Sequence, residues 1–241
     1  MHQPGDIEKA DHLRSFLGSA SPSPRPGAAG RIASRLSRKL VTPARVLGTR
    51  AMVPLSSRKL KKYSERKPLL LHLGCGYERK DGWINVDLVP GNVDLFWDLR
   101  NGIPFPESSV DAVFHEHLLE HLHKLDGLRF SAECLRVLKP GGVLRVVVPD
   151  AGSAIRGYVE DGDRYVGPFP TGLMAIESLF YNDGHISMFD SDTLVLLLRA
   201  AGFTEVQQQQ YGESWLTVAT PDSPSRRVGS LYVDARKANR D

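Results

Sequence analysis

The stretch Leu69–Leu88, LLLHLGCGYERKDGWINVDL, decides the fold of this chain. An apolar run, Leu69–Leu73, passes directly into Gly74-Cys75-Gly76, and a second apolar run ends at Asp87. Glycine has no Cβ atom, so this turn can be tight and its backbone can approach a ligand closely. An acidic residue at the end of the second strand is suited to accept hydrogen bonds from ribose hydroxyls. The stretch therefore predicts a site for a cofactor that contains adenosine.

The same stretch argues against a dinucleotide. A dinucleotide-binding turn has a third glycine where this chain has Arg79, and its acidic residue follows after about 20 positions. Here Asp87 comes only 13 positions after Gly74, and the lysine pattern of a P-loop is absent. A nucleoside without a pyrophosphate fits better, and S-adenosylmethionine is the main candidate.

Strand-like and helical patterns alternate along the rest of the chain. The predicted strands after the first are Ile84–Leu88, Val110–Phe114, Val143–Val148, Thr204–Gln210 and Trp215–Ala219. The predicted helices are Leu118–Leu138, which ends at Pro140 and Gly141, and Ser191–Ala201, which ends at Gly202. This alternation predicts an α/β fold with a mostly parallel sheet that is covered on both faces.

Five motifs, taken together, resemble those of class I S-adenosylmethionine-dependent methyltransferases. They are HLGCG (72–76), NVDL (85–88), WDLRNGIPFPESSVDAVF (97–114), HLLEHL (117–122) and LRVLKPGGVLRVVVPD (135–150). The resemblance covers about residues 69–219. Within this class, the chain resembles a bacterial subgroup that is often tied to polysaccharide and sugar modification. It implies a Rossmann-like fold whose seven-stranded, mostly parallel sheet has helices on both faces and an antiparallel last strand.

The resemblance also implies which residues bind S-adenosylmethionine. They are Gly74, Cys75, Gly76, Asp87, Leu88, Asp98, Leu99 and His115. The glycines would contact the methionine portion, Asp87 would hold the ribose, and Leu88 would flank the adenine. Asp98 would lie near the adenine amino group with Leu99 beside it, and His115 would line the sulfonium side. The chain departs from the family at His72, where an acidic residue is usual.

A dense histidine cluster, HEHLLEHLH (115–123), has four histidines and two glutamates in nine residues. On a helix, His117, Glu120 and His121 would share one face. Glu120 and His121 are interpreted either as residues that cap and pack this helix or as metal ligands. His117 is interpreted as a general base for a substrate hydroxyl, because an ordinary histidine pKa of about 6.5 suits proton removal near neutral pH.

In the metal interpretation, His117, Glu120 and His121 bind a divalent ion together with a distant residue such as His185. Small-RNA 2′-O-methyltransferases have a similar constellation, with Glu at the position of His117. The ion would orient sugar hydroxyls and lower their pKa, and two histidine ligands favour zinc, manganese or iron over magnesium. The pattern H-x-x-E-H also occurs in inverzincin peptidases, which leaves a zinc hydrolase as an alternative.

Residues 151–184 separate the predicted strand Val143–Val148 from the next helix, and a loop this long inside a compact domain is usually functional. The segment has five aromatic residues that could stack on a sugar ring, so we interpret it as a substrate lid. His185 follows directly. Both His185 and the histidine cluster are expected at the carboxyl edge of the sheet, where ligands bind in open α/β folds. We therefore predict that His117 and His185 are the catalytic residues.

The net charge of +3 hides an asymmetry between two parts of the chain. Residues 1–68 have 15 Lys/Arg and 4 Asp/Glu, whereas residues 69–241 have 16 and 24. We expect a flexible segment (1–30), a basic helical extension (31–68), a methyltransferase domain (69–220) and a C-terminal extension (221–241). The basic arm could contact anionic groups peripherally. The acidic body argues against a nucleic-acid substrate.

Composition excludes other classes. No apolar run approaches the length that spans a bilayer, the start lacks the features of a secretory signal, and two cysteines cannot form a disulfide framework. We therefore expect a cytoplasmic enzyme, either monomeric or homodimeric. Its predicted reaction is O-methylation of a sugar hydroxyl on a small-molecule or oligosaccharide acceptor. The alternative is a protein that binds S-adenosylmethionine with little activity and acts through its basic arm.

Overall fold

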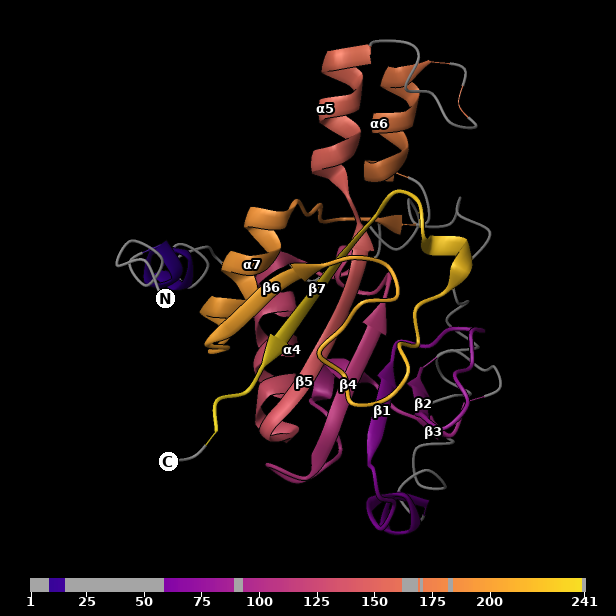
Figure 1. The fold of residues 1–241 in the computed structure, drawn as a ribbon, viewed down its shortest axis with the longest axis vertical. Coiled ribbons are helices and arrows are strands. Elements are labelled where there is room, and N and C mark those ends of the chain that lie inside the picture. Colours follow the sequence, from indigo (N-terminus) through magenta and orange to yellow (C-terminus); the bar gives the residue numbers. More distant parts are fainter. Residues whose placement is uncertain are drawn as a thin grey trace, which may run out of the picture.

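The computed structural model of the chain describes residues 9–15, 59–88, 93–161, 169, 171–181 and 184–239. Within these residues, seven strands form one sheet in the order β3-β2-β1-β4-β5-β7-β6 (Figure 1). The strands are β1 (Leu70–Leu73), β2 (Ile84–Asp87), β3 (Leu95–Phe96), β4 (Val110–Glu116), β5 (Leu138–Pro149), β6 (Glu205–Gln209) and β7 (Ser230–Arg236). The first five run parallel, and β7 is antiparallel to both of its neighbours. The predicted class I methyltransferase fold is confirmed.

The described helices with assigned bounds are α4 (Lys124–Val137), α5 (Ala151–Asp161), α6 (Gly172–Tyr181) and α7 (Ser191–Ala200), with short 3-10 turns η2 (Leu99–Asn101), η3 (Leu119–His121) and η6 (Pro224–Arg226). The prediction of one helix over 118–138 was wrong at its start. His117 has a φ of 52°, and Leu122 is extended after η3, so α4 begins only at Lys124. His117, Glu120 and His121 therefore do not lie on one face of a helix.

Alternation of apolar residues along the strands produces two different faces. On one face, side chains such as Leu71, Val113 and Leu144 pack against Phe130 of α4 and Leu197 of α7 in the main core. Figure 1 shows α4 and α7 together on this side of the sheet. Burial of this apolar face is the main force that fixes the register of the parallel strands.

The opposite face is covered differently from the prediction of helices on both faces. Among the described residues, the loop between β6 and β7 crosses this face (orange to yellow in Figure 1). Its Tyr211 and Leu216 pack against a second core of buried aromatic residues that includes Trp83, Phe114 and Tyr232.

A buried ion cluster attaches this loop to the sheet. Arg145 of β5 is fully buried and pairs with Asp222 of the loop at 2.6 Å and with Asp234 of β7 at 3.2 Å. The backbone N–H of Trp215 donates to the Asp234 carboxylate, not to a neighbouring strand. The strand expected at Trp215–Ala219 is therefore loop, and β7 lies instead in the segment 221–241, which was expected to be an extension.

The segment 151–184 contains a helical hairpin. Helices α5 and α6 project beyond the end of β5, at the carboxyl edge of the parallel strands (Figure 1). The hairpin exposes large apolar side chains, among them Val159, Leu173 and Tyr181. A hairpin at this edge could cover part of a ligand. Its role as a substrate lid stays a prediction.

The N-terminal predictions fall mostly outside the described residues. Residues 31–58 of the expected basic helical extension lie there, whereas residues 59–64 of the same extension are helical. Residues 9–15, expected to be flexible, form a short helix against α7, where the Arg14 Nε donates to the Ala200 carbonyl at 2.5 Å. In the described part of the chain, no helix is long and apolar enough to cross a membrane.

Candidate active site

The glycine turn after β1 has the conformation that its sequence predicts. Gly74 and Gly76 have φ angles of 68° and 54°, a region that residues with a Cβ rarely adopt. A Cβ built on Gly74 would lie 2.7 Å from Leu118 Cδ1, so space at this position is also limited. The turn therefore requires glycine both for its backbone and for the approach of Leu118.

Asp87 links the end of β2 to this turn. Its Oδ2 accepts a hydrogen bond of 2.7 Å from the backbone N–H of Gly76, which fixes the position of the turn relative to β2. Asp87 is only partly buried and lines a cavity. This is the position from which a carboxylate can accept hydrogen bonds from ribose hydroxyls.

The cavity has a volume of about 350 Å³ and opens between the glycine turn, the ends of β2 and β3, and α4. Such a volume lies within the range of about 300–1,000 Å³ that is typical of small-molecule sites. Five of the eight predicted cofactor residues line it: Gly74, Asp87, Leu88, Asp98 and Leu99. The residues present thus fit a nucleoside cofactor. The two carboxylates could accept hydrogen bonds from its polar groups, and the two leucines could pack against its flat base.

Asp98 has a structural partner of its own. Its carboxylate makes two hydrogen bonds with the Arg100 side chain, of 2.8 and 2.7 Å, and it also accepts from the Arg100 backbone N–H. Arg100 lines the cavity too, so this end of the cavity has a fixed ion pair. The pair keeps the Asp98 carboxylate oriented.

A second group of residues gathers around Glu120, which is 1% exposed. His117 Nδ1 lies 3.4 Å and His185 Nε2 lies 3.9 Å from Glu120 Oε1. Neither carboxylate oxygen has a hydrogen-bond partner among the described residues. Burial raises the pKa of Glu120 to about 8 because the charged form loses its hydration.

Backbone contacts bring His185 to this group from a distant part of the sequence. The N–H groups of Ile186 and Ser187 both donate to the Glu120 carbonyl, and the Ser187 hydroxyl donates to the Leu122 carbonyl. The His185 ring stacks edge-on against His121 with 5.0 Å between ring centroids. The predicted approach of His185 to the cluster is therefore observed.

His117 is held in a strained conformation. Its backbone N–H donates to the Val147 carbonyl, and its Nε2 lies 3.1 Å from the Ser230 hydroxyl oxygen. Its positive φ is uncommon for a residue with a Cβ, and such outliers concentrate at functional sites. The strain turns the chain between β4 and η3, so that Leu118 faces the cavity while Glu120 faces His117 and His185.

Comparison with known proteins agrees with this geometry. Residues 97–146 match a family described as a methyltransferase domain. A probable S-adenosylmethionine-dependent methyltransferase of Mycolicibacterium smegmatis is 44% identical over 57 residues, which are 22% of this chain and 21% of that protein. One of Mycobacterium tuberculosis is 33% identical over 104 residues, 43% of this chain and 30% of that protein. The matched stretches thus span less than a third of these relatives.

Over these stretches the chain is similar to proteins described as probable S-adenosylmethionine-dependent methyltransferases.

Solved structures of such enzymes are also similar. A methyltransferase of Thermotoga maritima is 20% identical with a TM-score of 0.47, over 80% of this chain and 94% of that one. The 1,6-didemethyltoxoflavin-N1-methyltransferase of Burkholderia thailandensis is 18% identical with a TM-score of 0.44, over 99% and 92%. The fold assignment of this chain rests on the strand order of its own sheet.

Three predicted cofactor residues do not line this cavity. The Gly76 backbone supports Asp87 from behind. Cys75 is buried, and burial raises the pKa of its thiol to about 12. His115 is fully buried, with its ring against Phe130 at 5.3 Å. The position of His115 follows from strand alternation, which directs it into the main core.

Sequence reasoning missed most of the apolar lining of the cavity. Trp97, Leu118, Leu122 and Phe130 line it together with the predicted residues. Leu118 and Leu122 belong to the cluster that was interpreted through its histidines alone. Phe130 could have been found from its spacing on α4, whereas the packing of Leu118 on Gly74 depends on the strained turn at His117.

The geometry also bears on His72 and on the H-x-x-E-H pattern. His72 is buried on the loop-covered face, where its Nδ1 lies 3.0 Å from Asn85 Oδ1 and burial lowers its pKa to about 4. The H-x-x-E-H segment is not a continuous helix, so it lacks the two histidines on one helix face that an inverzincin site requires. This removes the structural basis of the zinc hydrolase alternative.

Proposed function

We propose that this protein uses S-adenosylmethionine to methylate a hydroxyl oxygen of a saccharide or glycoconjugate acceptor. One observation carries the proposal: the turn 117–122 borders the nucleoside-sized cavity through Leu118 and Leu122, and it holds the Glu120 cluster on its other side. The same six-residue segment therefore borders both the cavity and the group of candidate bases.

The chemistry needed is limited. The acceptor oxygen forms a bond with the methyl carbon while the carbon–sulfur bond of the sulfonium breaks, and S-adenosylhomocysteine leaves as a neutral thioether. The hydroxyl proton must pass to a base. Enzymes accelerate such a step mainly by aligning the two reactants and by removing the proton.

We propose His117 and His185 as the residues that receive this proton. The His185 Nδ1 lies 3.0 Å from the Leu179 carbonyl oxygen. Because a carbonyl can only accept, Nδ1 is the donor and the lone pair of the neutral ring is on Nε2. A lone pair at the Glu120 cluster can accept a proton from a hydroxyl bound there.

Two features favour a sugar as the acceptor. The α5–α6 hairpin exposes Phe180 and Tyr181 at the carboxyl edge, and aromatic faces stack well on sugar rings. The sequence motifs also resemble those of a bacterial methyltransferase subgroup tied to polysaccharide and sugar modification. We propose that the hairpin covers the acceptor as a lid and that the acidic body excludes nucleic acids.

Transfer of tritium from labelled S-adenosylmethionine to a panel of glycans and nucleotide sugars tests the function. The wild type is expected to label at least one member, and His117→Asn and His185→Asn are expected to lose labelling while they still bind S-adenosylhomocysteine. The exposed His123, mutated to Asn, is the matched control. Tight cofactor binding without transfer to any acceptor would favour the alternative of a binding protein that acts through its basic arm.

A further inference from the structure

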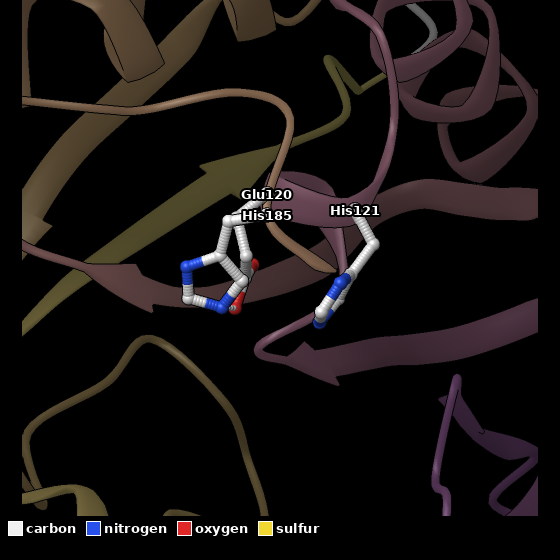
Figure 2. Close-up of side chains that lie close together, drawn as sticks. All are labelled: Glu120, His121 and His185. Carbon is white, nitrogen blue, oxygen red and sulfur yellow. Dashed lines mark ion pairs between the residues drawn. The ribbon is translucent and has the colours of Figure 1, made fainter. Parts of the chain in front are cut away.

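Three side chains around Glu120 form a potential metal site. Glu120, His121 and His185 each offer one ligand atom, and these atoms lie within 4.8 Å of one another. Figure 2 shows the carboxylate beside the His185 ring, with the His121 ring turned toward them. Bonds of about 2.0–2.1 Å to one ion would require separations of about 3.0–3.4 Å, so small side-chain rotations would close the set.

The Glu120 carboxylate gives an independent indication of a missing partner. It is 1% exposed, and neither oxygen has a hydrogen-bond partner among the described residues. A buried polar group without a partner costs about 1–3 kcal/mol, and native structures retain few of them. A ligand that binds Glu120 would remove this cost.

The orientation of the His185 ring indicates that this ligand is positively charged. Because Nδ1 donates to the Leu179 carbonyl, the Nε2 lone pair faces Glu120 Oε1 at 3.9 Å. When Glu120 is ionised, two acceptors face each other here, and they attract a cation between them. Histidines that bind metals commonly donate their other ring N–H to a backbone carbonyl, as His185 does.

We propose that Glu120, His121 and His185 bind a divalent first-row metal ion, which holds and activates the acceptor hydroxyl. Two imidazole nitrogens and one carboxylate suit manganese, iron(II) or zinc better than magnesium. Three protein ligands leave coordination positions for acceptor oxygens, and the ion lowers the pKa of a bound hydroxyl. This inference rests on the proposed methyltransferase function.

The proposal differs from the sequence interpretation in its ligand set. Glu120, His121 and His185 remain ligands, whereas His117 does not, because its Nε2 lies next to the Ser230 hydroxyl and its Nδ1 lies beside Glu120. His117 then acts as a positioning residue for the Glu120 carboxylate and as the base nearest to the ion. With His185 bound to the metal, proton removal falls to His117.

Metal binding is measured directly, without the reaction. The full-length protein is treated with chelator and dialysed against Mn²⁺ and, separately, Zn²⁺, and the bound metal is quantified. We expect one ion per chain in the wild type. We expect Glu120→Gln and His185→Asn each to weaken binding by at least about 100-fold, since even residues that only support ligands contribute 10–100-fold. His123→Asn should bind like the wild type.

S-Adenosylhomocysteine binding to each variant separates this inference from the proposed function. Loss of metal with unchanged S-adenosylhomocysteine affinity in Glu120→Gln and His185→Asn supports the site. A wild type that binds S-adenosylhomocysteine but neither metal overturns the metal site and leaves the methyltransferase standing. The small cavity of about 10 Å³ against Glu120 and His185 would then hold a water. A wild type that binds metal but not S-adenosylhomocysteine would overturn the proposed function instead.

Discussion

The substitution His115→Leu tests whether this histidine is a core residue, as the structure places it, or contacts the cofactor, as the family resemblance implies. His115 is fully buried on β4, and neither ring nitrogen has a hydrogen-bond partner among the described residues. Removing such a polar group relieves about 1–3 kcal/mol, and repacking around leucine costs less than about 1.5 kcal/mol. We expect the variant to be more stable than the wild type by about 1 kcal/mol at pH 7.5.

The gain should grow in acid. Burial, together with the nearby His72, lowers the pKa of His115 from 6.5 to about 3. As the pH falls, the unfolded chain therefore binds a proton at this histidine before the folded chain does. The free energy of unfolding of the wild type is unaffected by this histidine above pH 6.5 and falls below that pH. At pH 5, about 1.5 units lower, the loss in the wild type is about 2 kcal/mol at 1.36 kcal/mol per unit. The difference between variant and wild type should reach about 3 kcal/mol.

Urea unfolding followed by tryptophan fluorescence at pH 7.5 and pH 5 measures both quantities. His72→Leu is the control, because it also removes a histidine of lowered pKa but loses the contact with Asn85. It should therefore be less stable than the wild type at pH 7.5. A tenfold loss of S-adenosylhomocysteine affinity in His115→Leu would place His115 at the cofactor and refute its assignment to the core. Destabilisation by more than 1 kcal/mol at pH 7.5 would refute the magnitude.

Four further outcomes test the cofactor cavity and the fold. Asp87→Asn should weaken S-adenosylhomocysteine binding about 10- to 100-fold by calorimetry, because a charged hydrogen bond contributes about 1.5–3 kcal/mol, whereas the exposed Asp81→Asn should not. Gly74→Ala should also weaken S-adenosylhomocysteine binding. Adding Leu118→Ala, which removes the clash with the new Cβ, should restore only part of the affinity, because the positive φ remains. Arg145→Met should lower the free energy of unfolding by about 3–5 kcal/mol, because it leaves two buried carboxylates without their cation. Deletion of residues 1–30 should leave S-adenosylhomocysteine affinity within about twofold and lower the melting temperature slightly, because the arginine that caps α7 is lost.

The parallel half of the sheet was predictable because its signals are local. Strands β1, β2, β4 and β5 are apolar runs that end at or directly before a glycine or an acidic residue, and the end of β2 at Asp87 matches the sequence prediction. The two-residue strand β3 (Leu95–Phe96) has no such signal and was not predicted. The antiparallel half was less predictable. The pattern of Ser230–Arg236 includes the charged Asp234, which is tolerated inside the sheet only because Arg145, 89 residues earlier, neutralises it.

The residues that line the cavity were predicted better than the arrangement of the Glu120 cluster for a similar reason. Gly74 and Asp87 follow strands directly, so strand order alone brings them together. The Glu120 cluster depends on the left-handed conformation of His117 and on hydrogen bonds from the segment after α6. Neither feature has a local sequence signal, so the helical interpretation wrongly placed His117, Glu120 and His121 on one helix face. The approach of His185 was expected only because both segments lie at the carboxyl edge of the sheet.

The strained turn at His117 explains why the two sites can be close without overlapping. A continuous helix from Leu118 would direct residues three and four positions apart to one face, and Leu118, His121 and Leu122 would then share a side. The turn and η3 instead direct Leu118 and Leu122 to the cavity, while His121 contacts His185. A left-handed residue costs about 1–3 kcal/mol, and the hydrogen bond from the His117 N–H to Val147 offsets part of this cost. The strain therefore has a structural consequence: it places the apolar wall of the cavity and the polar Glu120 cluster on opposite sides of six consecutive residues.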